Sequence, residues 1–219
     1  MVSTVGRRRE HDGKTADALL DAAERTIAER GVDALSLRDL ARDAGTTTRA
    51  IYSLFGSKHG LVAVLGMRAF DLLRRDIETL PATDQPVEDL VVVALIFRHF
   101  ALDHPALFSI AFHRADPAIW PRVRAAAANA LAVLDERFEP LADADLLGGR
   151  SISEASTQFR ALGEGMAWTE LRGNPLPPDP ERCWRNAFHA LITGFATPPP
   201  GSRRTTRRRR RTAASPPGN

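Results

Sequence analysis

The sequence predicts an all-α protein of about nine helices, with an N-terminal three-helix helix-turn-helix domain and a C-terminal helical domain. Three observations lead to this prediction. Apolar residues recur every three or four positions along most of the chain, which is the period of an amphipathic helix. Glycine and proline residues divide these periodic segments into helix lengths. Between residues 35 and 61, two short helical segments flank a glycine turn, and a third helix follows at once.

The first helix of this motif is expected to begin after Ser36, whose hydroxyl can accept a hydrogen bond from a free backbone N–H of the first turn. The apolar residues between positions 37 and 44 form one face at helical spacing. Gly45 follows the last of them, where a helix end calls for a left-handed backbone that glycine adopts at low cost. This pattern predicts a short helix that ends in a tight turn.

The second helix of the motif is expected from about Thr48 to Phe55. Its apolar residues should face inward, which leaves Thr48, Arg49 and Tyr52 on the outer side. Arginine can pair with guanine, threonine can touch a thymine methyl group or a phosphate, and tyrosine can reach the DNA backbone. Such a face is typical of a recognition helix in the DNA major groove.

A third helix should start at Ser57, which can cap it, and Lys58 lies in its first turn. A helix N-terminus beside a lysine binds anions, and here the anion would be a DNA phosphate. The alternative is a helical bundle in which the glycine turn is only a connector. Arg38 and Arg49 would then be solvated charges, and Tyr52 would be a core residue with a wet hydroxyl. The agreement of the caps, the glycine and the outer face favours DNA binding.

From about Lys14 to Leu65 the chain resembles the tetracycline-repressor (TetR) family of bacterial transcriptional regulators. The resemblance rests on an ordered set of segments: 19–23 with 28–31, 36–41, the turn at 44–47, and 51–58, IYSLFGSK, which is similar to the family's Tyr-x-x-Phe-x-x-Lys end. It implies that Thr48, Arg49 and Tyr52 contact bases or their surroundings. It also implies that Thr47, Tyr52 and Lys58 hold phosphates, with Arg38 as a further phosphate contact. The sequence departs from the family at Leu54, where the family often has a histidine.

The formal net charge of +3 is due to the C-terminal segment of the chain. Residues 198–219 hold seven arginines and no acid, and without them 23 basic and 27 acidic side chains remain. DNA affinity must therefore come from a local basic face. Residues 1–13 are expected to form a flexible basic arm, and residues 198–219 a disordered Arg-rich tail. The tail is either a salt-sensitive grip on polyanions or a solvated segment without a selected role, and both interpretations stay open.

The helix-turn-helix domain is expected over residues 14–60 and a second helical domain over 61–197. The helices expected after the motif are Lys58 to about Leu80, residues 84–104, a short helix from Pro105, residues 116 to about 141, Ile152–Leu171 and Glu181–Phe195. The segment 104–108, HPALF, is similar to one group of TetR-family C-terminal domains. That similarity implies that the second domain binds an effector and dimerises.

Two sets of residues in the second domain are candidates for those roles. An effector pocket among the middle helices could be lined by aromatic residues with His113 as a polar anchor: Phe97, Phe100, Phe108, Phe112, His113 and Trp120. The resemblance implies a dimer interface on the last two helices, for which the candidates are Phe159, Met166, Trp184, Phe188 and Phe195. Packing within the core of one chain is the alternative for both sets.

The sequence gives no sign of an enzyme. It lacks a phosphate-binding glycine loop, a nucleophile elbow and a His-Glu-x-x-His helix. His99 and His104 are five residues apart and so lie on different helix faces. We therefore expect no catalytic residue, no cofactor and no metal. The single cysteine, Cys183, excludes an internal disulfide and fits a reducing cytoplasm. No apolar run approaches a membrane span and no secretory signal is evident, so we expect a cytoplasmic, nucleoid-associated protein without a membrane partner.

These observations predict a ligand-responsive, DNA-binding transcriptional regulator. By resemblance, it would be a homodimeric repressor that a small-molecule effector releases from a palindromic double-stranded DNA operator. The alternative is a helical protein–protein interaction module without sequence-specific DNA binding. The acidic, helix-rich second domain leaves this alternative open, whereas the outer face between Thr48 and Lys58 argues against it.

Overall fold

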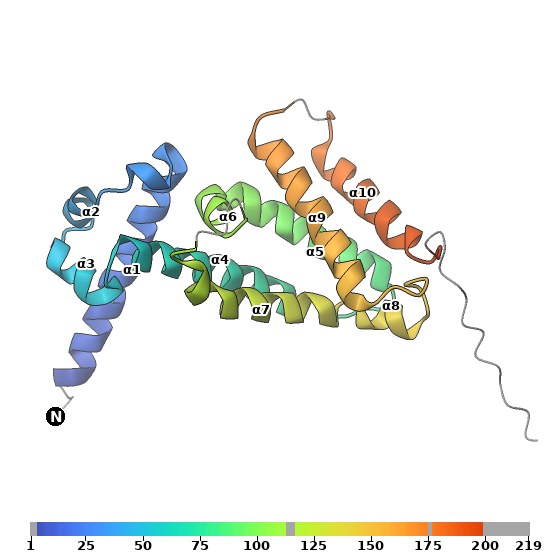
Figure 1. Cartoon of the computed structure of the whole chain (residues 1–219), viewed down its shortest axis with the longest axis horizontal. Coiled ribbons are helices and arrows are strands. Elements are labelled where there is room, and N and C mark those ends of the chain that lie inside the picture. The colour runs from blue at the N-terminus through green and yellow to red at the C-terminus, as the bar shows by residue number, and fades with distance from the viewer. Residues whose placement is uncertain (1–3, 113–116, 175–176, 199–219) are drawn as a thin grey trace, which may run out of the picture.

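The computed structural model describes residues 4–112, 117–174 and 177–198, and over these ranges it contains helices and no strand (Figure 1). The elements in chain order are α1 (Thr4–Arg30), the 3₁₀ helix η1 (Val32–Ala34), α2 (Leu37–Asp43), α3 (Thr48–Phe55), α4 (Lys58–Glu78), α5 (Pro86–Asp103), α6 (Pro105–Phe112), α7 (Trp120–Glu136), α8 (Glu139–Asp143), α9 (Ile152–Leu171) and α10 (Pro180–Gly194). The all-α prediction is confirmed. From residue 199 on, the expected tail lies outside the described residues.

The first part of the molecule, which we call the head, consists of α1, α2, α3 and the first two turns of α4. Its centre is formed by apolar side chains from all four helices: Leu19, Leu40, Ile51, Phe55, Leu61 and Leu65 are buried. Helix α1 begins at Thr4, so the expected arm over residues 1–13 continues into this helix from Thr4 onward. The flexibility of that arm stays a prediction.

The second part, which we call the body, contains the rest of α4 and helices α5 to α10. Helix α4 packs along α7, and α5 packs against α9 and α10. Figure 1 shows α4 leaving the head beside α3 and running into the body next to α7. The expected domain boundary after residue 60 therefore falls within the first turn of a continuous helix.

A largely buried polar network holds three helices of the body together. Arg98 on α5 makes a fork of two hydrogen bonds to Glu170 on α9, with Nε 3.0 Å from Oε2 and Nη2 2.5 Å from Oε1. The Trp184 indole on α10 donates to the same carboxylate over 3.1 Å. Since each charge is paired and hydrogen-bonded, the cost of its burial is offset.

The helix bounds follow the sequence prediction closely except at the two ends of α7. The helix expected from residue 116 to about Leu141 begins at Trp120 and ends at Glu136, and a separate α8 follows. Pro140 has no N–H to donate to the Glu136 carbonyl, so the helix cannot continue across this point. Arg137 lies in the resulting turn and donates from Nη2 to the carbonyls of Ile77 at 2.6 Å and Leu80 at 2.8 Å. The turn thereby caps the C-terminal end of α4.

Candidate functional site

The turn between α2 and α3 is fixed by backbone hydrogen bonds. Gly45 has a φ of 64°, its N–H donates to the Arg42 carbonyl at 3.1 Å, and the Thr46 N–H donates to the Ala41 carbonyl at 2.8 Å. This pair of bonds is a Schellman motif, which satisfies carbonyls at the end of a helix. Because glycine adopts the left-handed conformation without a steric penalty, Gly45 sets the angle at which α3 leaves α2.

Helix α3 presents its polar face to solvent. Thr48 and Arg49 are exposed, and Tyr52 keeps 56% of its surface accessible. Ile51 and Phe55, on the opposite face, are buried against the head. The amphipathic division expected from the sequence is therefore present, with the predicted contact residues on the open side.

The cap of α3 also lies on this open side. The exposed Thr47 is the N-cap, and its hydroxyl accepts a hydrogen bond from the Ala50 N–H over 3.2 Å. A hydroxyl that accepts one bond can still donate its own proton. Thr47 can thus fix the helix end and donate to a phosphate at the same time.

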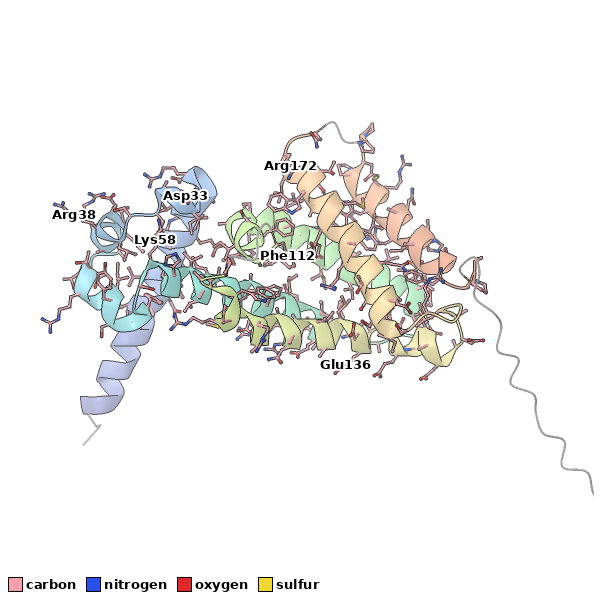
Figure 2. All side chains as sticks on the ribbon, viewed as in Figure 1. Asp33, Arg38, Lys58, Phe112, Glu136 and Arg172 are labelled. Carbon is pink, nitrogen blue, oxygen red and sulfur yellow. The ribbon has the colours of Figure 1, made fainter. Side chains whose placement is uncertain are left out.

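The two remaining predicted contacts flank α3 (Figure 2). Arg38, in the first turn of α2, is exposed. Lys58, in the first turn of α4, is half-buried, and its Nζ donates to the Asp33 carbonyl of η1 over 3.3 Å. An ammonium group has three protons, so this bond orients Lys58 and leaves protons for a second acceptor. Arg38, Thr47, Thr48, Arg49, Tyr52 and Lys58 all belong to the head.

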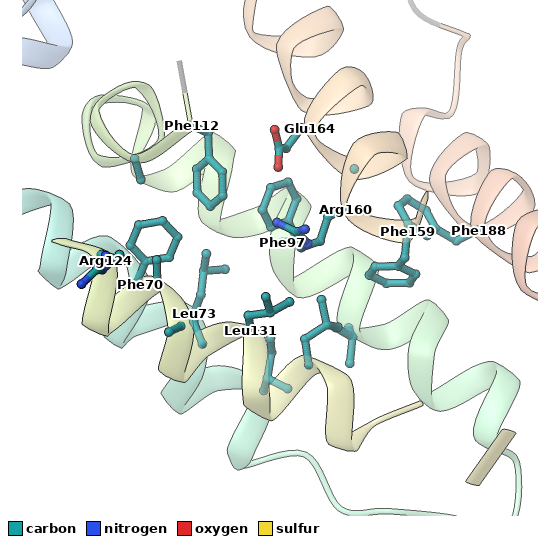
Figure 3. Close-up of a pocket in the computed structure, with 18 of the residues that line it drawn as sticks. Phe70, Leu73, Phe97, Phe112, Arg124, Leu131, Phe159, Arg160, Glu164 and Phe188 are labelled. Atoms are coloured by element: carbon teal, nitrogen blue, oxygen red, sulfur yellow. The ribbon is translucent and has the colours of Figure 1, made fainter. Parts of the chain in front are cut away.

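The body contains a cavity of about 480 Å³ (Figure 3). Its walls come from α4, α5, α6, α7, α9 and α10 and are mainly apolar; the lining residues are Phe70, Leu73, Ile77, Val93, Phe97, Ala111, Phe112, Trp120, Arg124, Ala127, Ala128, Ala130, Leu131, Leu134, Phe159, Arg160, Gly163, Glu164 and Phe188. A concave apolar site with few polar groups is the usual form of a small-molecule site, and this volume falls within the usual range.

Three of the six predicted pocket residues line this cavity: Phe97, Phe112 and Trp120. Phe100 and Phe108 do not, because both are buried in the packing behind the wall. The Phe108 ring lies 5.7 Å from that of Phe97 and 5.0 Å from that of Trp168, measured between ring centroids. Core packing accounts for both residues, and neither belongs to this cavity. His113 lies outside the described residues.

Three charged residues of the cavity were not predicted: Arg124 on α7, and Arg160 and Glu164 on α9. Figure 3 shows Arg160 and Glu164 reaching from α9 toward the ring of Phe97. The Nε atom of Arg160 is buried and has no hydrogen-bond partner. Burial raises the pKa of Glu164 above its ordinary value, and the nearby charge of Arg160 opposes this shift. In the sequence these residues resemble ordinary solvated helix charges, and only their repeat at i and i+4 hinted at a shared face.

The predicted dimer residues mostly belong to the core of the single chain. Phe159, Trp184, Phe188 and Phe195 are buried, and Met166 is half-buried against the same core. Their rings pack on one another, as the 4.6 Å between the Phe159 and Phe188 centroids shows. Four of these five side chains therefore have almost no surface left for a partner. Any contact between two copies through α9 and α10 would use Met166 or other positions that keep surface accessible.

Two further kinds of site were sought within the described ranges. His, Cys, Asp and Glu side chains nowhere gather there in a group of three that could hold a metal ion. No single helix of this part of the chain has the length and apolar composition to cross a membrane. Helices α5 and α6 meet those criteria only as a pair, across a bend of 109°.

Comparison with known proteins connects the head and the body to one family. Residues 19–65 match the family model of bacterial regulatory proteins of the tetR family. Residues 90–191 match the tetracyclin repressor-like C-terminal domain. The chain belongs to the TetR family. It is accordingly a transcriptional regulator with a helix-turn-helix domain, and not an enzyme.

Individual TetR-family proteins show the same relation. An HTH-type transcriptional regulator of Mycobacterium bovis is 24% identical over 111 residues, which cover 49% of this chain and 47% of that protein. The chain spans about half the length of the curated relatives it matches. Among solved structures, a protein of unknown function from Rhodococcus sp. RHA1 superposes with a TM-score of 0.72 at 24% identity, covering 84% of this chain and 96% of that one. The TetR-family transcriptional regulator PfmR from Thermus thermophilus gives a TM-score of 0.61 at 19% identity, covering 80% and 96%. These likenesses support the fold.

Proposed function

We propose that this TetR-family regulator is a homodimeric repressor that binds a palindromic operator and leaves it when a small molecule enters the body. The observation that carries the proposal is the open face of α3. Thr48, Arg49 and Tyr52 are exposed there, while the opposite face of the helix is buried and its N-terminus is capped. A rigid short helix with an exposed arginine, threonine and tyrosine suits direct contact with base edges.

Two copies of the chain would place their α3 helices in successive major grooves, roughly 34–36 Å apart. In each copy, Thr47 and Lys58 would donate to phosphates on either side of the groove, and Arg38 would add a further phosphate contact. These contacts fix the position of the head on the duplex, whereas Arg49 carries the preference for sequence. We further propose that the regulator works in the cytoplasm, at the nucleoid.

Helix α4 supplies a route from ligand to DNA. It starts at Lys58 beside α3 and carries the cavity residues Phe70, Leu73 and Ile77 further along. From Lys58 to Phe70 the helix rises by about 18 Å. A ligand seated against these side chains would favour one position of α4 and hence one separation of the two heads. It can shift the balance only through its different affinities for the two states.

Contacts between α1 and the rest of the molecule would pass this movement on. Asp21 on α1 pairs with Arg68 on α4, with 2.7 Å between Oδ1 and Nη1. Glu24 on α1 lies 2.8 Å from Nδ1 of His104, the residue between α5 and α6. The head is thus connected both to a wall of the cavity and to the start of α6, which carries Phe112.

Selection of bound DNA from a random pool, with the full chain, tests the proposal. A palindromic consensus with one helical turn between half-site centres is the expected result. Arg49→Ala should then cost about 1–3 kcal/mol on the selected operator and relax preference at one base pair. Arg75→Ala, which removes an exposed arginine of α4 outside the head, is the matched control and should bind as the native chain does. A pool without an enriched sequence would instead favour the protein–protein interaction module.

A further inference from the structure

The charged side chains in the wall of the cavity narrow the kind of ligand that can bind there. We propose that the cavity takes an amphipathic monoanion, with an apolar body and one carboxylate that accepts hydrogen bonds from the guanidinium of Arg160. This inference rests on the proposed function, since it assigns the effector site to the same cavity.

The first step of the argument is the unsatisfied donor. The side chain of Arg160 ends in a guanidinium, which donates hydrogen bonds and accepts none. Its Nε is buried and unpartnered, although the residue lies in the cavity wall. A buried donor without an acceptor is destabilising, and more so when the group is charged. An acceptor brought by a ligand would recover that cost.

The second step is the charge of the whole wall. The cavity carries two arginines, Arg124 and Arg160, and one acid, Glu164, so its charged groups sum to a positive value even when Glu164 is ionised. Burial also raises the pKa of Glu164, which favours its neutral form. A cationic ligand would meet net repulsion, whereas a single negative charge would be attracted.

The geometry of the arginine favours a carboxylate over an anion that has only one acceptor atom. A guanidinium donates two parallel hydrogen bonds to a carboxylate, and Arg98 and Glu170 make such a fork elsewhere in this chain. Glu164 lies one helical turn from Arg160 on α9, so its carboxyl group, when protonated, can donate to the same head group. The remaining walls are phenylalanine, leucine and alanine side chains, which suit an apolar body.

Calorimetric titration of the full chain with pairs of ligands tests this proposal. Decanoate is compared with decan-1-ol, and 1-naphthoate with naphthalen-1-ylmethanol, so that each pair shares its apolar body and differs in charge. We expect the carboxylate of at least one pair to bind about tenfold or more tightly than its alcohol. Arg160→Gln should remove that preference and leave the alcohol affinity unchanged. Arg160→Lys should keep part of the preference, because the charge remains while the fork is lost.

Arg75→Gln, an arginine outside the cavity, serves as the control and should keep the full preference. Circular dichroism of Arg160→Gln verifies that the variant is folded. Equal binding of acid and alcohol in both pairs, no binding of any of the four, or a preference that survives in folded Arg160→Gln would each overturn the proposal. Operator release is measured separately, so that a carboxylate that binds without releasing DNA counts against the ligand-responsive function alone.

Discussion

Replacing Glu170 with alanine should show how strongly the buried polar network holds the body together. The side chains of Arg98 and Glu170 are only 12% and 9% exposed, and the Trp184 indole also depends on this carboxylate. Glu170→Ala leaves a largely buried cation without its partner. Breaking such a pair costs about 3–5 kcal/mol, a large share of a total stability of roughly 5–15 kcal/mol. The thermal midpoint should fall by roughly 6–20 °C for a chain of this size.

The measurement is urea unfolding followed by far-UV circular dichroism, at one fixed protomer concentration because self-association would add to the apparent stability. Glu181→Ala is the matched control. Its carboxylate pairs with Arg185 over 3.0 Å on the surface of α10, and the two side chains are 45% and 48% exposed. Exposed pairs contribute about 0–1 kcal/mol.

A double variant distinguishes the effect of losing the ion pair from the effect of leaving one charge without its partner. Arg98→Met with Glu170→Leu replaces both charges with apolar side chains, and it should regain most of the stability that Glu170→Ala loses. The reasoning would be refuted if Glu170→Ala cost no more than the exposed control. It would also fail if the double variant were the least stable of the three.

Two further predictions concern the head and the cavity. Thr47→Ala should cost about 1 kcal/mol of stability through the lost N-cap, and it should weaken binding to operator and random DNA alike. Thr47→Ser keeps the hydroxyl and should retain the stability and the DNA affinity. A loss of binding confined to the operator in gel-shift titrations would contradict a phosphate role. Because burial raises the pKa of Glu164, the folded chain holds this proton more tightly than the unfolded chain. Its contribution to the free energy of unfolding should therefore decrease as pH rises from 4.5, the ordinary pKa of a glutamate side chain, through the folded pKa. Glu164→Gln should gain stability relative to the native chain over that interval, and parallel pH profiles in urea unfolding would disprove it.

The helices were predictable because local signals mark their ends. Helix α9 occupies the residues predicted for it, and the capping box between Ser151 and Glu154 fixes its start. The end of α7 was not recognised, although Pro140 marked it. A proline removes the N–H that would bond to the carbonyl four residues earlier, so the helix ends one turn before the proline. The apolar periodicity continues through this turn and therefore does not mark the helix end.

The outer face of α3 could also be predicted, since exposure of a short helix follows from its period once one face is apolar. The cavity could be predicted only in part. Phe97 and Phe108 are both apolar residues of helices in the same body, and the packing of several helices decides which ring faces the void. For the same reason, Phe188 on α10 could not be distinguished from a residue that faces a second subunit. Arg160 escaped notice because a charge on an amphipathic helix normally points to solvent.

The continuity of α4 limits how regulators of this type can be recombined. A hybrid joined after residue 60 would separate the DNA-reading part from Leu61 and Leu65, which complete its interior. A join between Pro81 and Gln85 would keep the shared helix whole, and the pair of Asp21 and Arg68 would travel with it. The body of such a chimaera must still contain His104, which contacts Glu24 of α1, and Arg137, which caps the C-terminal end of α4. Because α4 also carries the cavity residues Phe70, Leu73 and Ile77, exchanging the head by this join would also change one wall of the ligand site.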